Sequence, residues 1–204
     1  MQMTFDYINY WEQTYKTGGN SGSGSYGVLA EFKAAVVNAY IERYNVNEVI
    51  EFGCGDGHQL GLINYPQYIG LDISSESVRI CQEKYGDDQT KAFATYHPLT
   101  WTGDQQGMQA DMTVCLDVLY HIIDESHFQA TLSHVLNTSR DVVVIYSKLD
   151  TGEDEQVIYT IKDRDLLSRL AQFSDFQIVE RIPQVYPDHS SASFVILRRK
   201  SAIA

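Results

Sequence analysis

The sequence EVIEFGCGDG at residues 48–57 joins a short apolar run to three alternate glycines. The apolar run has the length and composition of a buried strand. The glycines at positions 53, 55 and 57 let the backbone turn sharply and let a ligand approach without meeting a Cβ atom. Backbone N–H groups at a following helix start can also bind an anionic group. This stretch therefore predicts a strand, a ligand-binding turn and a short helix, in that order.

An acidic residue follows the second predicted strand. Residues 67–71 (QYIGL) form the next apolar run, and Asp72 comes directly after it, about twenty residues beyond the first strand. In nucleotide-binding α/β sheets, a carboxylate at this place accepts hydrogen bonds from ribose hydroxyls. A Gly-x-Gly pair alone is a weak signal, and the position of Asp72 makes it considerably stronger.

Helix and strand patterns alternate along the rest of the chain. Apolar residues at helical spacing predict a helix over residues 28–44. Ser74 or Ser75 can cap the next helix, Asp124 the one after it, and Asp163 starts the last. The alternation predicts an α/β protein with a mostly parallel, seven-stranded sheet covered by helices on both faces. Its closing strands form a hairpin, which places an antiparallel strand at the end of the sheet. The strands are expected at residues 48–52, 67–71, 91–95, 111–116, 141–146, 176–182 and 192–198.

The bulk composition fits one globular domain. The chain has 204 residues, of which 44% are hydrophobic and 21% charged, enough to bury a full core. No apolar stretch approaches the roughly 20 residues of a membrane helix, and the first residues lack the pattern of a secretory signal, so we expect a cytoplasmic protein. Cys54, Cys81 and Cys115 are too few and too scattered for a disulfide framework or a thiolate zinc site. We interpret them as reduced, buried thiols.

The charge balance argues against a nucleic-acid partner. Lys and Arg total 15 against 27 Asp and Glu, a net charge of −12. Nucleic-acid binders usually carry a basic stripe, because phosphate contacts supply much of their affinity. The one basic cluster, residues 198–200, lies at a predicted strand end. Small neutral or cationic ligands suit this balance better than polyanions.

The first 27 residues differ from the remainder in composition. Tyr7, Tyr10, Trp11 and Tyr15 precede a glycine- and serine-rich run at residues 18–27. This segment is either a flexible linker after a short amphipathic helix or a lid whose aromatic residues close over a ligand. We therefore divide the chain into a lid segment, residues 1–27, and a domain at residues 28–204.

Two classes of cofactor compete for the glycine turn. A dinucleotide fingerprint requires Gly-x-Gly-x-x-Gly, or alanine at the last place, which here is His58. The observed Gly-x-Gly-x-Gly pattern, preceded by Glu51, resembles the first motif of the class I S-adenosylmethionine (SAM)-dependent methyltransferases. The resemblance extends over nearly the whole chain from Val28, including the closing hairpin. It implies a three-layer, Rossmann-like sandwich, with SAM as the methyl donor and S-adenosylhomocysteine (SAH) as product.

The resemblance also implies roles for the residues of the turn. Gly53, Gly55 and Gly57 would make room for SAM, and Cys54 would contribute backbone to the same turn. Glu51 would orient the loop or receive the cofactor's ammonium group through water.

Further cofactor contacts are implied after the second and fourth strands. Asp72 would bind the ribose, Ile73 would pack against adenine, and Asp117 would form the floor of the methionine and methyl region. The alternative for both aspartates is helix N-capping. Residues 95–100 depart from the family, because they lack the acidic residue that often binds the adenine amino group; backbone groups or Thr100 would have to substitute.

His121 is the best candidate for a general base. It follows the fourth predicted strand, at the carboxyl edge of the sheet where ligands bind in open α/β folds. Tyr120 is its neighbour and would line the same pocket. The alternatives are that His121 packs under the next helix, or that His97 is the base. No metal site is expected, because His121 and His127 have the wrong spacing and no carboxylate pair completes a set.

The acceptor pocket is expected to be small. Trp11, Tyr15 and Tyr26 would supply its other wall, and no large insertion between strands is evident. The sequence therefore predicts a methyltransferase for a small-molecule acceptor, at oxygen in the first instance and at nitrogen in the second. The alternatives are a protein or RNA methyltransferase, which would need a basic docking surface, and a SAM-binding module without catalysis. The oligomeric state stays open.

Overall fold

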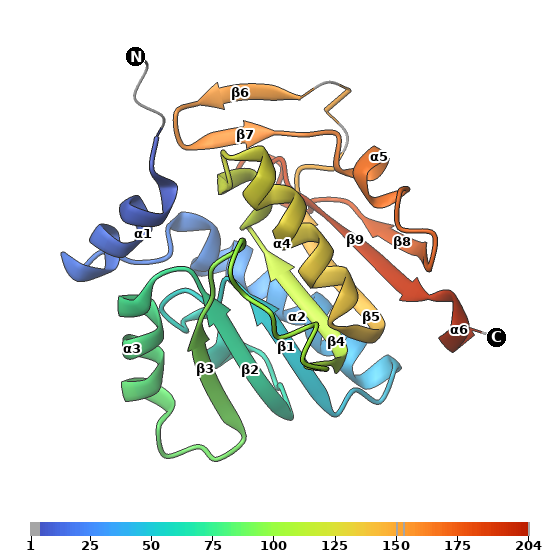
Figure 1. Cartoon of the computed structure of the whole chain (residues 1–204), viewed down its shortest axis with the longest axis horizontal. Helices are drawn as coiled ribbons and strands as arrows, with labels where there is room; N and C mark the ends of the chain where they lie inside the picture. The colour runs from blue at the N-terminus through green and yellow to red at the C-terminus, as the bar shows by residue number, and fades with distance from the viewer. Residues whose placement is uncertain (1–4, 150, 153, 204) are drawn as a thin grey trace.

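A seven-stranded sheet forms the centre of the protein in the computed structural model, which describes residues 5–149, 151–152 and 154–203 (Figure 1). The strand order is β3-β2-β1-β4-β5-β9-β8. The first five strands in this order are parallel, and β9 is antiparallel to both of its neighbours. This architecture confirms the predicted α/β class and the Rossmann-like sandwich. The strands are β1 (Glu48–Phe52), β2 (Gln67–Asp72), β3 (Lys91–Thr95), β4 (Ala110–Leu116), β5 (Ser139–Ser147), β8 (Phe176–Ile182) and β9 (Ser193–Arg199).

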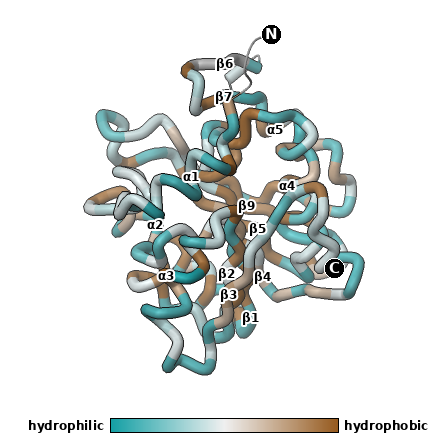
Figure 2. The backbone as a smooth tube through the Cα atoms, turned by 60° about the vertical axis from the view of Figure 1, so that its left-hand side comes forward, coloured by the Kyte–Doolittle hydropathy of each residue, from teal (hydrophilic) through white to brown (hydrophobic). Residues whose placement is uncertain are grey.

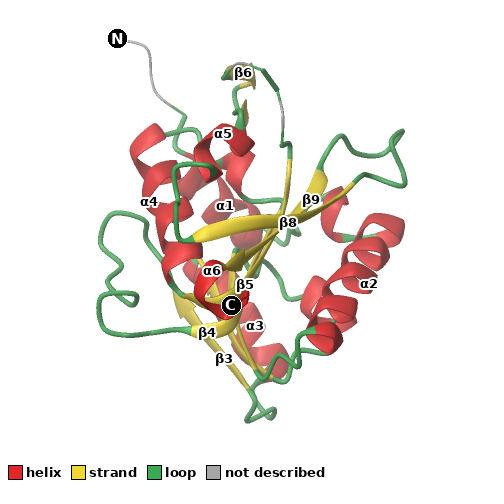
Figure 3. Cartoon of the chain, turned by 90° about the vertical axis from the view of Figure 1, so that its right-hand side faces the viewer, coloured by secondary structure: helices red, strands yellow, loops and turns green. Residues whose placement is uncertain are grey.

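Helices cover both faces of the sheet. Figure 3 shows α2 on one side of it and α4 and α5 on the other. Each face has its own hydrophobic cluster, one shared with α2 and α3 and one with α4 and α5. Within the described residues, no helix combines the length and the hydropathy that crossing a membrane requires. The helices are α1 (Tyr7–Lys16), α2 (Gly27–Arg43), α3 (Ser75–Tyr85), α4 (Glu125–Asn137), α5 (Leu166–Leu170) and α6 (Lys200–Ile203).

The inner strand β5 lies in the hydrophobic core of the protein. Residues 142–146 are all hydrophobic and nearly inaccessible to solvent, as expected for a strand covered on both faces. Figure 2 shows hydrophobic segments gathered along the inner strands and hydrophilic segments mostly in the outer loops. All three cysteines are buried and free, which confirms their interpretation as reduced thiols.

Two predicted helix caps are confirmed. Ser74 accepts a hydrogen bond from the Ser77 N–H at the start of α3, and Asp124 accepts one from the His127 N–H at the start of α4. The short helix predicted after the glycine turn is a 3₁₀ helix, η2, at Gln59–Leu62.

The prediction that Asp163 starts a helix is wrong. Asp163 ends strand β7 (Ile161–Asp163), which pairs with β6 (Glu155–Ile158) in a separate two-stranded sheet. The helix α5 begins at Leu166, where Asp165 caps it by accepting from the Ser168 N–H. This short hairpin, which follows β5, was not predicted.

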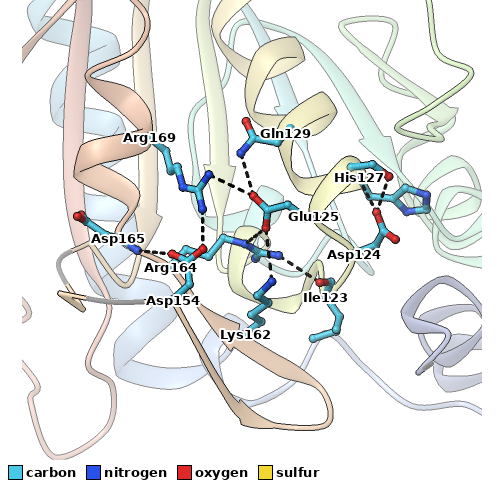
Figure 4. Close-up of polar contacts among 11 residues, drawn as sticks. Ile123, Asp124, Glu125, His127, Gln129, Asp154, Lys162, Arg164, Asp165 and Arg169 are labelled. Atoms are coloured by element: carbon cyan, nitrogen blue, oxygen red, sulfur yellow. Dashed lines mark hydrogen bonds and ion pairs between the residues drawn. The ribbon is translucent and has the colours of Figure 1, made fainter. Parts of the chain in front are cut away.

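Ion pairs fasten the hairpin to the main domain (Figure 4). Glu125, at the first turn of α4, lies 2.9 Å from Arg164 Nε and 3.5 Å from Lys162 Nζ. The same carboxylate lies 3.3 Å from Arg169 of α5, which also contacts Asp154. The hairpin is therefore held beside α4 rather than projecting freely.

The closing hairpin inserts β9 between β5 and the edge strand β8. Residues 194–197 of β9 are buried, whereas most of β8 is exposed. The antiparallel strand is therefore second from the edge, and the chain's last sheet strand completes the core.

Leu132 tests the packing of α4 on the sheet. Leu132→Ala removes a side chain that is 0% exposed, so we expect a loss of about 2–5 kcal/mol in the free energy of unfolding, measured by urea denaturation. The matched control Leu99→Ala alters a leucine that is 57% exposed and should change it by less than about 0.5 kcal/mol. Equal effects would contradict the assignment of the core.

Candidate functional site

A cavity of about 390 Å³ lies where the carboxyl ends of β1, β2 and β4 meet the N-terminal segment. Ligands bind at this edge of open α/β sheets. Most of the residues predicted for the site share its wall, although they come from four separate parts of the chain. The predicted residues lining it are Trp11, Tyr15, Glu51, Gly53, Cys54, Gly55, Asp72, Ile73, Asp117, Tyr120 and His121.

Two predicted site residues lie outside this lining. Gly57 faces α3, where an added Cβ would stand 2.8 Å from a ring carbon of Tyr85 and 3.0 Å from Cys81 Sγ. Position 57 requires glycine because the backbone packs closely on α3 and has a φ of +69°. Tyr26 stacks on the His58 ring, with centroids 4.0 Å apart, and does not line the cavity.

The other two glycines of the turn do face the cavity. Gly53 and Gly55 have φ values of +89° and +56°, a region that glycine occupies without strain. A Cβ on Gly55 would stand 2.3 Å from Ser21 Oγ and 3.2 Å from the Tyr15 hydroxyl. The lack of a side chain at Gly55 therefore leaves room for Ser21 and Tyr15 of the N-terminal segment beside the cavity.

Asp72 holds the glycine turn from the neighbouring strand. Its Oδ2 accepts the Gly55 N–H and its Oδ1 accepts the Ser74 N–H, both at 2.9 Å. Burial raises the pKa of this carboxyl to about 6, although these hydrogen bonds oppose the shift. The N-cap residue of α3 is Ser74, so Asp72 is not the helix cap that the alternative interpretation proposed.

Asp117 forms an ion pair inside the cavity wall. Its φ of +59° is uncommon for a residue with a side chain, and such conformations concentrate at functional sites. Lys33 Nζ lies 2.6 Å from Oδ2, and the Tyr120 hydroxyl donates to Oδ1 at 2.6 Å. The helical turn that follows has no side-chain cap, so the capping alternative does not describe Asp117 either.

Lys33 was missed by the sequence analysis. It is only 1% exposed and lies on the apolar face of α2, one turn from Ala30 and Val37. A lysine on the buried face of a helix requires a charged partner, because burial of an unpaired charge is costly. This irregularity in the helical pattern was the available signal.

Glu51 is buried at the end of β1. The Tyr68 hydroxyl of β2 donates to its Oε2 at 2.7 Å. Burial raises the pKa of Glu51 to about 7, in spite of this hydrogen bond and the nearby Lys33 cation.

The N-terminal segment is attached to the glycine turn through Asp56. The Ser21 N–H and the Tyr26 hydroxyl donate to Asp56 Oδ2 at 2.9 Å and 2.7 Å. In return, the Asp56 N–H donates to Ser21 Oγ at 2.9 Å. Asp56 and Ser21 were not predicted to act, since nothing in the sequence shows that they meet.

A second attachment joins α1 to α3, which lie next to each other in Figure 1. Glu12 accepts from the hydroxyls of Ser74 and Ser75 and from the Glu76 N–H. Burial alone would raise the pKa of Glu12, but these hydrogen bonds, together with Lys16, lower it to about 2.

Aromatic rings enclose His121 on the acceptor side. The Trp11 and Tyr120 ring centroids lie 5.3 Å and 4.6 Å from that of His121. His121 Nδ1 lies 3.1 Å from the Thr160 carbonyl at the tip of the β6–β7 hairpin. Because a carbonyl only accepts, Nδ1 carries the proton and Nε2 keeps its lone pair. Burial lowers the pKa of His121 and favours the neutral ring.

The alternative base His97 lies elsewhere. Its ring packs near His127, with centroids 5.5 Å apart, and it does not line the cavity. The segment after β3 contributes Tyr96 instead, whose hydroxyl bonds Thr131 Oγ1 at 3.1 Å, while Thr100 is not in the lining. Among the described residues, no group of histidine, cysteine, aspartate or glutamate side chains is arranged to hold a metal ion.

Comparison with known proteins agrees with this geometry. Residues 50–143, which include the turn, Asp72 and Asp117, match the model of a family described as a methyltransferase domain. The match covers less than half of the 204 residues and agrees with the resemblance to the SAM-dependent methyltransferases. The chain is also 39% identical over 62 residues to an mRNA cap guanine-N(7) methyltransferase of Eremothecium gossypii, a match spanning 28% of the chain and 14% of that relative's length.

Solved structures share the fold over almost the whole chain. The chain is similar to N-methyltransferase NodS from Bradyrhizobium japonicum, with a TM-score of 0.72, 12% identity, and coverage of 96% of this chain and 100% of the other. It is also similar to magnesium protoporphyrin IX methyltransferase from Synechocystis, with a TM-score of 0.67, 15% identity, and coverage of 98% and 100%. At these identities the structures establish a common fold.

Glu12 tests the attachment of α1. Glu12→Ala removes three hydrogen bonds to α3, so we expect about tenfold faster amide hydrogen exchange in α1 at pH 7, measured by mass spectrometry. Because the folded pKa is lowered to about 2, the contribution is complete above about pH 4.5 and is lost as the pH falls toward 2. The two proteins should therefore converge near pH 2. The exposed Glu31→Ala serves as control, and a variant as protected as wild type would disprove the attachment.

Proposed function

We propose that this enzyme transfers the methyl group of SAM to an oxygen atom of a small-molecule acceptor. The observation that carries the proposal is the single cavity in which the glycine turn, Asp72 and Asp117 share a wall with the enclosed His121. A cofactor site and a candidate base thus face the same space.

The cavity wall fits SAM. Gly53 and Gly55 line the cavity, and the buried Asp72 carboxylate is placed to accept the two ribose hydroxyls, with Ile73 against adenine. When bound, SAM supplies an electrophilic methyl group on a positively charged sulfur. Lys33, at the same wall, offers a cation to the carboxylate of the cofactor's methionine moiety, and Asp117 forms the floor beside it.

Other predicted cofactor residues support the turn. Cys54 contributes backbone to it, and Gly57 acts from behind by packing on α3. Glu51 is fixed by Tyr68 and places an acid beneath the turn.

His121 removes the acceptor's proton. The Thr160 carbonyl fixes the tautomer in which Nε2 is free, and burial keeps the ring neutral at physiological pH. Methyl transfer is an in-line displacement, so the remaining task of the protein is alignment. Trp11 and Tyr120 perform it by confining the acceptor beside His121.

Residues 1–27 act as a lid. Within the described part, residues 5–26 cover the cavity and are attached through Asp56 and through Glu12. Tyr15 and Tyr26 act by holding this lid against the turn, Tyr15 through Ser21 and Tyr26 through Asp56. Ligand exchange requires the lid to open, as with other loops that exclude water from a reaction.

A macromolecular acceptor is the second candidate, because an mRNA cap methyltransferase and a small RNA methyltransferase are among the similar proteins. The net charge of −12 and the lid over the cavity favour a small molecule instead. Nitrogen as acceptor atom is the nearest variant of the proposal. Cytoplasmic location stays a prediction.

Asp72→Ala tests the cofactor site. Loss of charge-assisted hydrogen bonds to two hydroxyls should weaken SAH binding about 100-fold or more, measured by calorimetry. Because burial raises the pKa of Asp72 to about 6, wild-type affinity should also fall as the pH is lowered through about 6. The exposed Asp88→Ala is the matched control. Unchanged affinity in Asp72→Ala would place the ribose elsewhere.

His121→Ala tests the base. We expect about 100-fold slower SAH formation over pools of hydroxylated metabolites, with SAH affinity unchanged. The wild-type rate should decline in acid, below the ordinary histidine pKa because burial lowers it, and the variant should lack this decline. The exposed His189→Ala should behave as wild type. A variant as fast as wild type would return His121 to a packing role.

A further inference from the structure

One buried acceptor in the cavity wall has no protein partner. Gln59, the first residue of η2, follows the glycine turn and is only 7% exposed. Its Nε2 donates to the Ala30 carbonyl at 2.9 Å. Within the described residues, its Oε1 receives no hydrogen bond, although the side chain lines the cavity.

The orientation of the Gln59 amide is fixed by Ala30. Exchanging its nitrogen and oxygen would set two carbonyl oxygens against each other, so the unpaired atom is the acceptor Oε1. A buried acceptor without a donor is unfavourable, and such groups in native proteins await a ligand or water. Oε1 therefore marks a place for an N–H or O–H donor.

Two carbonyls of the turn are already occupied. The Gly55 carbonyl accepts from Ser77 Oγ and Cys81 Sγ, and the Gly57 carbonyl accepts from Tyr85 and Lys84. A carbonyl has two lone pairs, so both are fully used.

Each oxygen of Asp117 already has one donor from the protein, because Lys33 Nζ binds Oδ2 and the Tyr120 hydroxyl donates to Oδ1. Lys33 also lies one helical turn after Ala30, the partner of Gln59. The free acceptor and the buried cation therefore come from the same region of the wall, where a ligand bearing both an ammonium and a carboxylate finds complementary groups.

We propose that Gln59 Oε1 accepts a hydrogen bond from the α-ammonium group of the cofactor's methionine moiety. Gln59 thereby selects ligands with an amino-acid tail over those that carry the adenosine part alone. The inference rests on the proposed SAM site and adds to it a specificity-determining residue.

The test compares two ligands. SAH carries the amino-acid tail, whereas 5′-methylthioadenosine has the same nucleoside and thioether but no ammonium or carboxylate. In Gln59→Leu, calorimetry should show about 10- to 100-fold weaker binding of SAH and unchanged binding of 5′-methylthioadenosine. Gln59→Glu should retain SAH binding, because it keeps an acceptor although it loses the donor to Ala30.

Gln82→Leu, the same change on α3 outside the cavity, should alter neither affinity. Equal weakening of both ligands in Gln59→Leu, or no weakening of SAH, would overturn the inference and leave the proposed function standing. A wild-type protein that binds neither ligand would instead contradict the proposed cofactor site itself.

Discussion

The bond between the Asp72 carboxylate and the Gly55 N–H organises the site. It ties the end of β2 to a turn whose positive φ angles leave few intrinsic constraints on its path. Through its second oxygen, Asp72 also positions Ser74, which caps α3 and binds Glu12 of the N-terminal helix. The glycine turn, α3 and α1 are therefore all connected to one buried carboxylate.

Burial of this carboxylate has a cost that a ligand can relieve. Its pKa is raised because the cavity wall removes it from water, and backbone donors compensate only in part. Hydroxyl groups of a ribose would complete its set of donors. The same reasoning applies to Gln59, whose free oxygen lies farther along the same loop. These two groups are the ones to which the proposed ligand would add hydrogen bonds.

Much of this arrangement was accessible from the sequence. The glycine spacing, Asp72 and His121 follow local patterns at strand ends, and a parallel sheet brings such positions to one edge. The partners that hold them were not accessible. Lys33 and Asp117 are 84 residues apart, and Ser21 meets Asp56 only because the N-terminal segment folds back over the turn. Contacts of this kind depend on tertiary packing, which no local periodicity records.

The β6–β7 hairpin was missed for a different reason. Its strands are short and lie outside the main sheet, so they break the alternation on which the prediction relied. Aspartate is a common N-cap residue, but the cap of α5 is Asp165 and not Asp163. Local propensity correctly indicated an aspartate as the cap, but it indicated Asp163 instead of Asp165.

The partner of His121 is a main-chain carbonyl, and this has an evolutionary consequence. Substitutions at position 160 leave that oxygen in place as long as the hairpin keeps its backbone. Under the proposed function, neighbouring positions of the tip, such as the exposed Tyr159, could then diversify toward new acceptors while the hydrogen bond that orients His121 is kept. Side-chain variation at the tip is thereby separated from the backbone contact that orients His121.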